Sequence, residues 1–244
     1  MTSHALIYGA SGGIGRALTQ RLLEHGWRIT VAGRARPRLP EGPEDRLFPV
    51  EADACSPDGA AVAFAAAQDA FGLPDAIFNC IGSLHLKPLH RTSPAEFAEV
   101  MRVHVFSSYA ILRQAAEHLV HGGSVTLLSS AAARTGLPNH EAIGAAKAAI
   151  EGLTLSAAAT YAPRGLRVNA VAPGLTETPM TRALTTGPGR AVSERMHALG
   201  RLGKPEDIAS ALAWLADPEQ SWVTGQILHV DGGLAHLRSL PRQG

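Results

Sequence analysis

Four glycines near the start of the chain are spaced so that backbone amides could bind a phosphate. They separate an apolar run, residues 5–8, from a segment with helical periodicity, residues 14–23, and they are Gly9, Gly12, Gly13 and Gly15. A strand, a glycine turn and a helix in this order direct free N–H groups and the positive end of the helix dipole at an anion. We therefore expect the pyrophosphate of a dinucleotide here. The alternative is a glycine-rich turn without a ligand, because the spacing G-x3-G-x-G departs from the common G-x-G-x-x-G fingerprint.

An arginine follows the second predicted strand, where the adenosine ribose of a dinucleotide would lie. This strand covers residues 28–32, and Arg34 comes two residues after it. An acidic residue at this place would bind the ribose 2′-hydroxyl, whereas a guanidinium suits a 2′-phosphate. Arg34, with Arg36 behind it, favours NADP(H) over NAD(H). A solvated basic loop is the alternative, since the proline-rich residues 37–43 fit a surface segment.

Strands and helices alternate along the chain and must position these groups. The predicted strands are 5–8, 28–32, 47–51, 75–79, 124–128, 167–172 and 227–230. The predicted helices are 14–23, 58–71, 93–118, 139–162, 192–199 and 205–216. The alternation predicts an α/β fold, in which residues 1–244 form one Rossmann-type domain with a doubly wound parallel sheet of about seven strands flanked by helices.

Residues 175–200 are interrupted by proline and glycine and follow the sixth predicted strand. Because ligands bind at the carboxyl edge of such sheets, we predict that this segment is a mobile substrate lid. It is rich in threonine and arginine, which is typical of a segment that binds a polar or anionic group, although a solvated loop would have the same composition.

Composition excludes several classes of function. The net charge is +1 at pH 7 and 45% of the residues are hydrophobic, which is ordinary for a globular protein and predicts no nucleic-acid partner. The apolar runs are too short to span a membrane. The two cysteines, Cys55 and Cys80, form no pattern and are expected as small buried side chains rather than a disulfide. We expect a cytoplasmic protein that acts on a small molecule.

Eight short motifs stand in the order and at the spacing typical of one family. They are GASGGIG at 9–15, Asp53-Ala54, NCIG at 79–82, SS at 129–130, Lys147, RVNAVAPG at 167–174, GRLGKPEDIA at 200–209 and TGQILHVDGG at 224–233. On these motifs the chain resembles the short-chain dehydrogenase/reductase family over nearly its whole length. One small departure is Tyr8, where the family usually has threonine.

The resemblance implies a Rossmann fold, a nicotinamide cofactor and a homo-oligomer, either a tetramer or a dimer. It also implies which residues hold the cofactor. These are Gly9, Ser11, Gly13, Ile14 and Gly15 at the pyrophosphate, Arg34 at the 2′-phosphate, Asp53 and Ala54 at the adenine, Asn79 and Gly82 at the ribose and nicotinamide, Lys147 at the ribose hydroxyls, and Pro173, Gly174 and Thr178 at the carboxamide and phosphate.

The catalytic residues depart from the family. The resemblance implies that Ser130 binds the reacting oxygen and that Lys147 acts beside it. The proton-donating tyrosine of the family should lie four residues before Lys147, but Ile143 occupies that position. The family's asparagine in the preceding helix is replaced by His104. Isoleucine has no proton to give, so the usual acid is absent.

Two histidines could replace that acid. His140 lies seven residues before Lys147, two helical turns away and on roughly the same side, and the enoyl reductases of the family have their tyrosine at this spacing. A histidine titrating near neutral pH could donate the proton. His140 could instead be a surface or capping residue, and His104 either a proton relay or a core histidine. The spacing of the histidines predicts no metal site, and Asp231 is expected to be structural.

The function predicted from these observations is NAD(P)H-dependent oxidoreduction with a non-standard proton donor. A hydride would be transferred to or from a small organic carbonyl or alcohol, or a conjugated enoyl compound. The alternative is a catalytically degenerate NADP(H)-binding protein that acts as a redox sensor or assembly subunit. A non-redox isomerase or lyase that reuses the cofactor is a third candidate.

Overall fold

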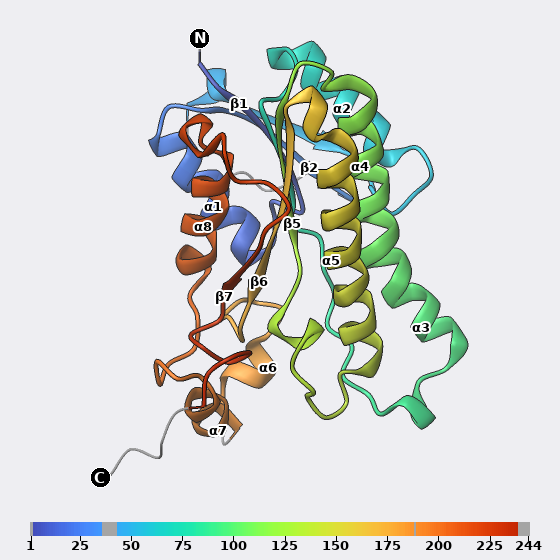
Figure 1. The fold of residues 1–244 in the computed structure, drawn as a ribbon, viewed down its shortest axis with the longest axis vertical. Coiled ribbons are helices and arrows are strands. Elements are labelled where there is room, and N and C mark those ends of the chain that lie inside the picture. The colour runs from blue at the N-terminus through green and yellow to red at the C-terminus, as the bar shows by residue number, and fades with distance from the viewer. Residues whose placement is uncertain (1, 36–42, 188, 239–244) are drawn as a thin grey trace.

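The computed structural model describes residues 2–35, 43–187 and 189–238, and its centre is a seven-stranded sheet (Figure 1). All neighbouring strands pair in parallel, in the order β3-β2-β1-β4-β5-β6-β7. The strands are β1 (His4–Tyr8), β2 (Arg28–Gly33), β3 (Leu47–Glu51), β4 (Ala76–Asn79), β5 (Gly123–Leu128), β6 (Leu166–Pro173) and β7 (Ile227–Val230). The order reverses between β1 and β4, which creates a crevice at the carboxyl ends of these strands. The predicted doubly wound sheet is confirmed.

Helices cover both faces of the sheet (Figure 1). One face carries α1 (Gly13–Glu24) and α8 (Pro205–Ala216), and the other carries α2 (Gly59–Phe71), α4 (Ser107–His118) and α5 (Glu141–Tyr161). The strands are buried on both sides and are therefore apolar at successive positions.

Strand β1 shows how one short segment serves both cores. Ala5 and Ile7 pack in the core with α1 and α8, whereas Leu6 and Tyr8 pack in the core with α2 and α4. The Tyr8 hydroxyl donates a 2.9 Å hydrogen bond to the carbonyl of Ala60 in the first turn of α2. Tyr8, which stands where threonine was expected, thus links β1 to α2 through a buried hydrogen bond.

The long helix predicted for residues 93–118 is interrupted by a π-helical segment, Arg102–Phe106, between α3 (Pro94–Met101) and α4. Ser93 begins α3 with a capping box, in which its hydroxyl accepts from the Glu96 amide and the Glu96 carboxylate accepts from the Ser93 amide. The π-helical segment widens the turn and contains His104. The apolar periodicity of residues 93–118 did not indicate this interruption of the helix.

Helix α5 begins at Glu141 rather than at the predicted residue 139, because Asn139 has a left-handed backbone with φ of 63°. Residues 175–200 form two short helices, α6 (Arg182–Thr185) and α7 (Gly189–Met196), so the helix predicted at 192–199 begins and ends three residues earlier. Cys55 and Cys80 are free cysteines, as expected.

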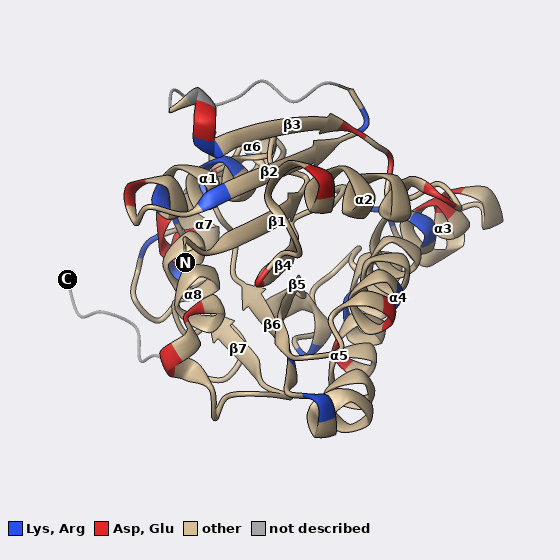
Figure 2. Ribbon diagram, turned by 90° about the horizontal axis from the view of Figure 1, so that it is seen from above, with Lys and Arg blue, Asp and Glu red and all other residues tan. Residues whose placement is uncertain are grey.

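Charged residues of both signs are interspersed along the helices, and neither sign dominates one side of the molecule (Figure 2). Within the described ranges, every helix is too short or too polar to cross a lipid bilayer.

Candidate active site

A cleft lies along the carboxyl edge of the sheet, at the reversal between β1 and β4. Its inner half lies between the start of α1, the ends of β4, β5 and β6, and α5. Its outer half continues past the ends of β2 and β3. The two halves share seven lining residues: Ser11, Gly12, Cys80, Ile81, Gly82, Ser83 and Met180. The cleft therefore runs unbroken past the glycine turn.

The glycine turn packs as closely as its sequence suggested. A Cβ on Gly15 would lie 2.5 Å from the carbonyl oxygen of Gly9, and a Cβ on Gly9, whose φ is 78°, would lie 2.7 Å from the backbone of Cys80. Helix α1 begins at Gly13 after the N-cap Gly12, and no described side chain caps it. Its first amides therefore remain free for an anion, as a pyrophosphate site requires.

Arg34 lies exposed at the end of β2 and lines the outer half together with Asp53 and Ala54. The Asp53 carboxylate accepts a 3.0 Å hydrogen bond from the Cys55 amide, which fixes the turn after β3. Arg36 lies outside the described residues. The structure thus brings Arg34, Asp53 and Ala54 to the same end of the cleft.

Asn79 is buried at the end of β4, and its side chain bonds within the protein. Its amide nitrogen donates to the hydroxyls of Ser107 and Ser108 at 3.1 and 3.0 Å, and its oxygen accepts from the Ile81 amide at 3.0 Å. This side chain holds α4 against the sheet, whereas Gly82 itself lines the cleft. Asn79 therefore shapes the cleft wall rather than facing the cleft.

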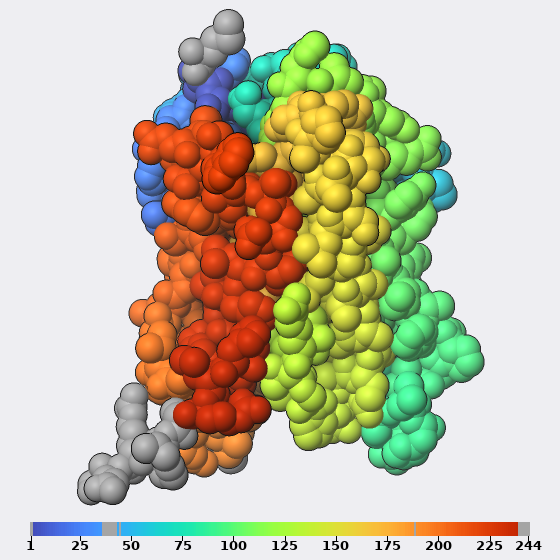
Figure 3. Space-filling model, viewed as in Figure 1, coloured from blue at the N-terminus to red at the C-terminus, as the bar shows by residue number. Residues whose placement is uncertain are grey.

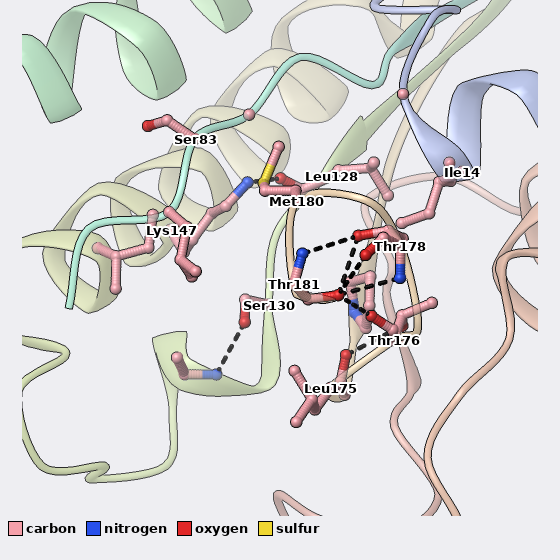
Figure 4. A pocket seen from close by; sticks show the side chains of 18 of the residues that line it. Ile14, Ser83, Leu128, Ser130, Lys147, Leu175, Thr176, Thr178, Met180 and Thr181 are labelled. Atoms are coloured by element: carbon pink, nitrogen blue, oxygen red, sulfur yellow. Dashed lines mark hydrogen bonds between the residues drawn. The ribbon is translucent and has the colours of Figure 1, made fainter. Parts of the chain in front are cut away.

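Lys147 is buried and reaches into the inner half from α5, beside Leu128 and Met180 (Figure 4). Its Nζ donates a 2.6 Å hydrogen bond to the carbonyl of Leu128. Burial lowers the pKa of Lys147 to about 8. Burial raises the pKa of the adjacent Cys80 thiol to about 12, so that this thiol stays protonated. The ammonium is thus held close to its titration point.

Ser130 faces the same space from the loop after β5 (Figure 4). Its Oγ accepts a 3.2 Å hydrogen bond from the Ala132 amide, which fixes the side chain in place. Because this bond uses a lone pair of the oxygen, the hydroxyl proton remains free to donate to a ligand.

His104 is almost fully buried and lines the inner half. Its Nε2 lies 3.3 Å from the Ser83 amide, which can only donate, so the neutral ring carries its proton on Nδ1. That Nδ1 is buried without a hydrogen-bond partner among the described residues. Burial, reinforced by the charge of Lys147, lowers the pKa of His104 to about 3. The ring is therefore neutral at physiological pH.

His140 lies half-buried at the N-cap of α5 and lines the inner half with Ser130 and Lys147. Its Nδ1 is 2.7 Å from the carbonyl of Pro138, so Nδ1 carries a proton and donates it to that oxygen. The second nitrogen, Nε2, is the atom at which this ring can gain or lose a proton.

Ile143 forms part of an apolar wall of the inner half. It is 6% exposed and packs with Val100, Ala142 and Ala146. The other apolar lining residues are Leu84, Leu86, Leu137, Leu175, Met180, Leu184 and Leu234. Ile143, at the position where a tyrosine was expected, thus belongs to a hydrophobic surface, and the inner half is mainly apolar.

Pro173, Gly174 and Thr178 line the inner half beside the glycine turn. A Cβ on Gly13 would lie 2.8 Å from the methyl group of Thr178, so this segment touches the start of α1. One of the arginines of the segment, Arg190, forms ion pairs with Glu177 and Glu194. Its guanidinium does not line the cleft, so it gives no support to an anionic substrate group.

Several lining residues were not predicted from the sequence, and Ser83 and Met180 are the two with the clearest positions in the cleft. Ser83 bonds the ring of His104 from the loop after β4, and Met180 lies between the two halves of the cleft. Ser83 directly follows the motif at 79–82, which is the signal that could have indicated it. Met180 had no such signal, because its position depends on the fold of residues 175–181.

Comparisons with known proteins identify similar chains. The family model described as "Enoyl-(Acyl carrier protein) reductase" matches residues 9–235. The cis-4-hydroxycyclohexanecarboxylate dehydrogenase of Sinomonas cyclohexanicum is 34% identical, with 94% of this chain and 95% of that protein covered. The 3-oxoacyl-[acyl-carrier-protein] reductase FabG of Vibrio cholerae is 32% identical, with 94% and 96% covered.

Solved structures show the same fold. ElxO with NADP bound has a TM-score of 0.90 at 25% identity, covering 96% of this chain and 99% of that one. The aldohexose dehydrogenase of Thermoplasma acidophilum has a TM-score of 0.89 at 28% identity, covering 100% and 98%. The chain belongs to the short-chain dehydrogenase/reductase family. The curated relatives are a dehydrogenase and a reductase, and the ElxO structure holds NADP.

The lowered pKa of Lys147 predicts a measurable pH dependence of stability. Between pH 8 and 10 the unfolded chain binds a proton on this lysine that the folded chain has released, so folding is favoured as pH rises. Relative to Lys147→Met, the wild-type free energy of unfolding should increase by about 1.4 kcal/mol per pH unit in this window. Urea denaturation at several pH values measures it. The exposed Lys204→Met is the control, and a flat difference for Lys147→Met contradicts the shift.

Proposed function

We propose that the protein is an NADP(H)-dependent oxidoreductase whose proton donor is His140 in place of the family tyrosine. The observation that carries this proposal is the joint placement of Ser130, Lys147 and His140 around one apolar space beside the uncapped start of α1. The substrate would be a small apolar carbonyl or alcohol, or a conjugated enoyl compound.

The residues of the glycine turn fit a dinucleotide. The free amides at the start of α1 would bind the pyrophosphate, and the space that a Cβ on Gly15 would fill allows helix and strand to meet beside it. Arg34 would bind the 2′-phosphate at the outer end of the cleft. When bound, the nicotinamide supplies or accepts the hydride.

Ser130 and the apolar wall would position the substrate. The free hydroxyl proton of Ser130 would donate to the reacting oxygen, and the side chains around Ile143 would exclude water from it. An ammonium at Lys147 would add positive charge where the oxygen becomes negative. The lining favours an apolar substrate body with one polar end.

The proton would come from Nε2 of His140. Its Nδ1 is engaged with Pro138, so a protonated ring presents Nε2–H and returns to the neutral form when that proton leaves. In carbonyl reduction the proton would go to the oxygen held by Ser130. In enoyl reduction Ser130 would stabilise an enolate, and the proton would go to carbon. His104 is the weaker candidate because its ring is neutral at physiological pH.

One observation favours a second function. Ile143 packs tightly in an apolar cluster, so the tyrosine position has been incorporated into the hydrophobic wall. A chain selected only to bind NADP(H), as a redox sensor or assembly subunit, would tolerate this change. Ser130 favours the oxidoreductase over the binding protein, because a protein that only binds NADP(H) does not need a hydroxyl at this place.

Cofactor preference can be tested by fluorescence titration with NADPH and NADH. We expect NADPH to bind at least tenfold more tightly, and Arg34→Leu to weaken NADPH binding roughly 10- to 100-fold through loss of a charge-assisted contact. NADH binding should not change. Arg113→Leu, in α4 and outside the cleft lining, is the control. Equal affinities for the two cofactors in the wild type would contradict the NADP(H) assignment.

The proton donor can be tested by following NADPH oxidation with apolar ketones and enoyl thioesters. His140→Ala should lower kcat about 10²- to 10⁴-fold and leave NADPH affinity unchanged, because it removes a general acid but no cofactor contact. His90→Ala, at an exposed histidine, is the matched control. Unchanged turnover in His140→Ala would show that another group donates the proton. Tight NADPH binding without turnover on any acceptor would favour the binding protein.

Restoring the family tyrosine gives an independent test. In Ile143→Tyr the phenol would lie one helical turn before Lys147 on the same face of α5, and we expect ketone reduction to rise at least tenfold. Ile143→Phe adds a ring of similar bulk without the hydroxyl and should show no gain. Equal rates in the two variants would contradict the interpretation that Ile143 occupies the position of the family's acid.

A further inference from the structure

Three side chains of metal-ligand type meet at the end of the sheet, away from the catalytic residues. His229 lies on β7, Asp231 follows the strand by one residue, and His236 lies in the turn that comes next. Their ligand atoms all lie within 4.8 Å of one another. The two imidazole rings meet edge to face with centroids 4.3 Å apart.

We infer that His229, Asp231 and His236 bind a divalent transition-metal ion, with Zn²⁺ as the best match. Two imidazoles and one carboxylate are a common donor set for this ion. The Nδ1 of His229 is 3.6 Å from an Asp231 oxygen. Two ligands of one tetrahedral Zn²⁺ lie about 3.3 Å apart when each bond is about 2.0 Å. The His236 ring is exposed and can rotate to complete the set.

A second observation points to a ligand. Nδ1 of His229 is buried and has no hydrogen-bond partner among the described residues. Buried polar nitrogens are nearly always satisfied in folded proteins, and an unsatisfied one costs stability. A metal ion bound at Nδ1 would satisfy this nitrogen and use its lone pair.

The carboxylate is already held in position. One oxygen of Asp231 accepts from the Gly233 amide at 2.8 Å, and the other accepts from the Ala235 amide at 2.9 Å. Each oxygen keeps a lone pair for a metal, and such hydrogen bonds orient a metal-binding carboxylate. Gly232 and Gly233 have φ of 59° and 85°, so the turn has a backbone that other residues rarely adopt. His229 and Asp231 would therefore need to move little to bind the ion.

The site lies outside the cleft but shares a segment with it. His229 and Asp231 line a separate surface hollow with Arg201 and Asp207. In the space-filling view the C-terminal segment runs beside the loop that follows β5 (Figure 3). Leu234, between Asp231 and His236, lines the inner half of the cleft. A bound ion would therefore fix the turn that holds Leu234 against the substrate space.

The test is calorimetric titration of the chelator-stripped, tag-free protein with ZnCl₂, together with thermal unfolding. We expect one Zn²⁺ per chain and a rise in Tm. Absorption bands typical of tetrahedral Co²⁺ should appear on titration with CoCl₂. His236→Gln should weaken Zn²⁺ binding at least tenfold, and His229→Gln with His236→Gln should abolish it. His90→Gln, at an exposed histidine, should bind like the wild type.

Asp231→Asn alone is not a suitable test of metal binding, because this carboxylate also holds the turn. His236 is exposed and can be replaced without loss of the fold. No Zn²⁺ binding in the wild type, or equal binding in the double histidine variant, would overturn the inference. NADPH binding is measured on the same samples. The three ligands do not line the cleft. A protein that binds NADPH but no Zn²⁺ would therefore contradict the metal site and leave the proposed function standing.

Discussion

The cleft depends on one close approach, that of helix α1 to strand β1. The carbonyl of Gly9 lies where a side chain on Gly15 would begin, so only a glycine lets the helix start this near the strand. That contact directs the free amides of the helix into the reversal point of the sheet. The ends of β4 and β5 then place Gly82 and Ser130 along the same edge. The uncapped start of α1 therefore lies at the centre of the cleft, between its inner and outer halves.

Burial governs the inner half of the cleft. Lys147, His104 and Cys80 are all removed from water, and each shifts toward its neutral form. A low dielectric also strengthens the few remaining donors, chiefly the hydroxyl of Ser130. The inner half thus combines a mainly apolar lining with the few polar groups of Ser130, Lys147, His104 and His140.

The fold could be predicted almost completely, because buried parallel strands are short apolar runs and turn residues mark their ends. The glycine turn was predicted from the same pattern, whereas Ser130, Lys147 and His140, which line one pocket, were predicted from the family resemblance. Features that depend on contacts between distant residues could not be predicted. His104 is neutral because of its burial and the nearby charge of Lys147. Arg190 is engaged in an ion pair with Glu177, and His229 approaches His236 through the turn after β7. Spacing along the chain carries no information about such contacts.

The π-helical segment, Arg102–Phe106, has a consequence for the helix that contains it. Its wider turns accommodate one more residue than an α-helix of the same length. The residues of α4 are therefore out of phase with those of α3 by about 100°. Each half can present its own apolar side, α4 to the sheet and α3 to the start of α5. An evolutionary deletion within 102–106 would restore a regular helix, but it would rotate α3 away from α5 and displace residue 104 from the cleft. The length of this segment therefore constrains the cleft as much as the residues in it do.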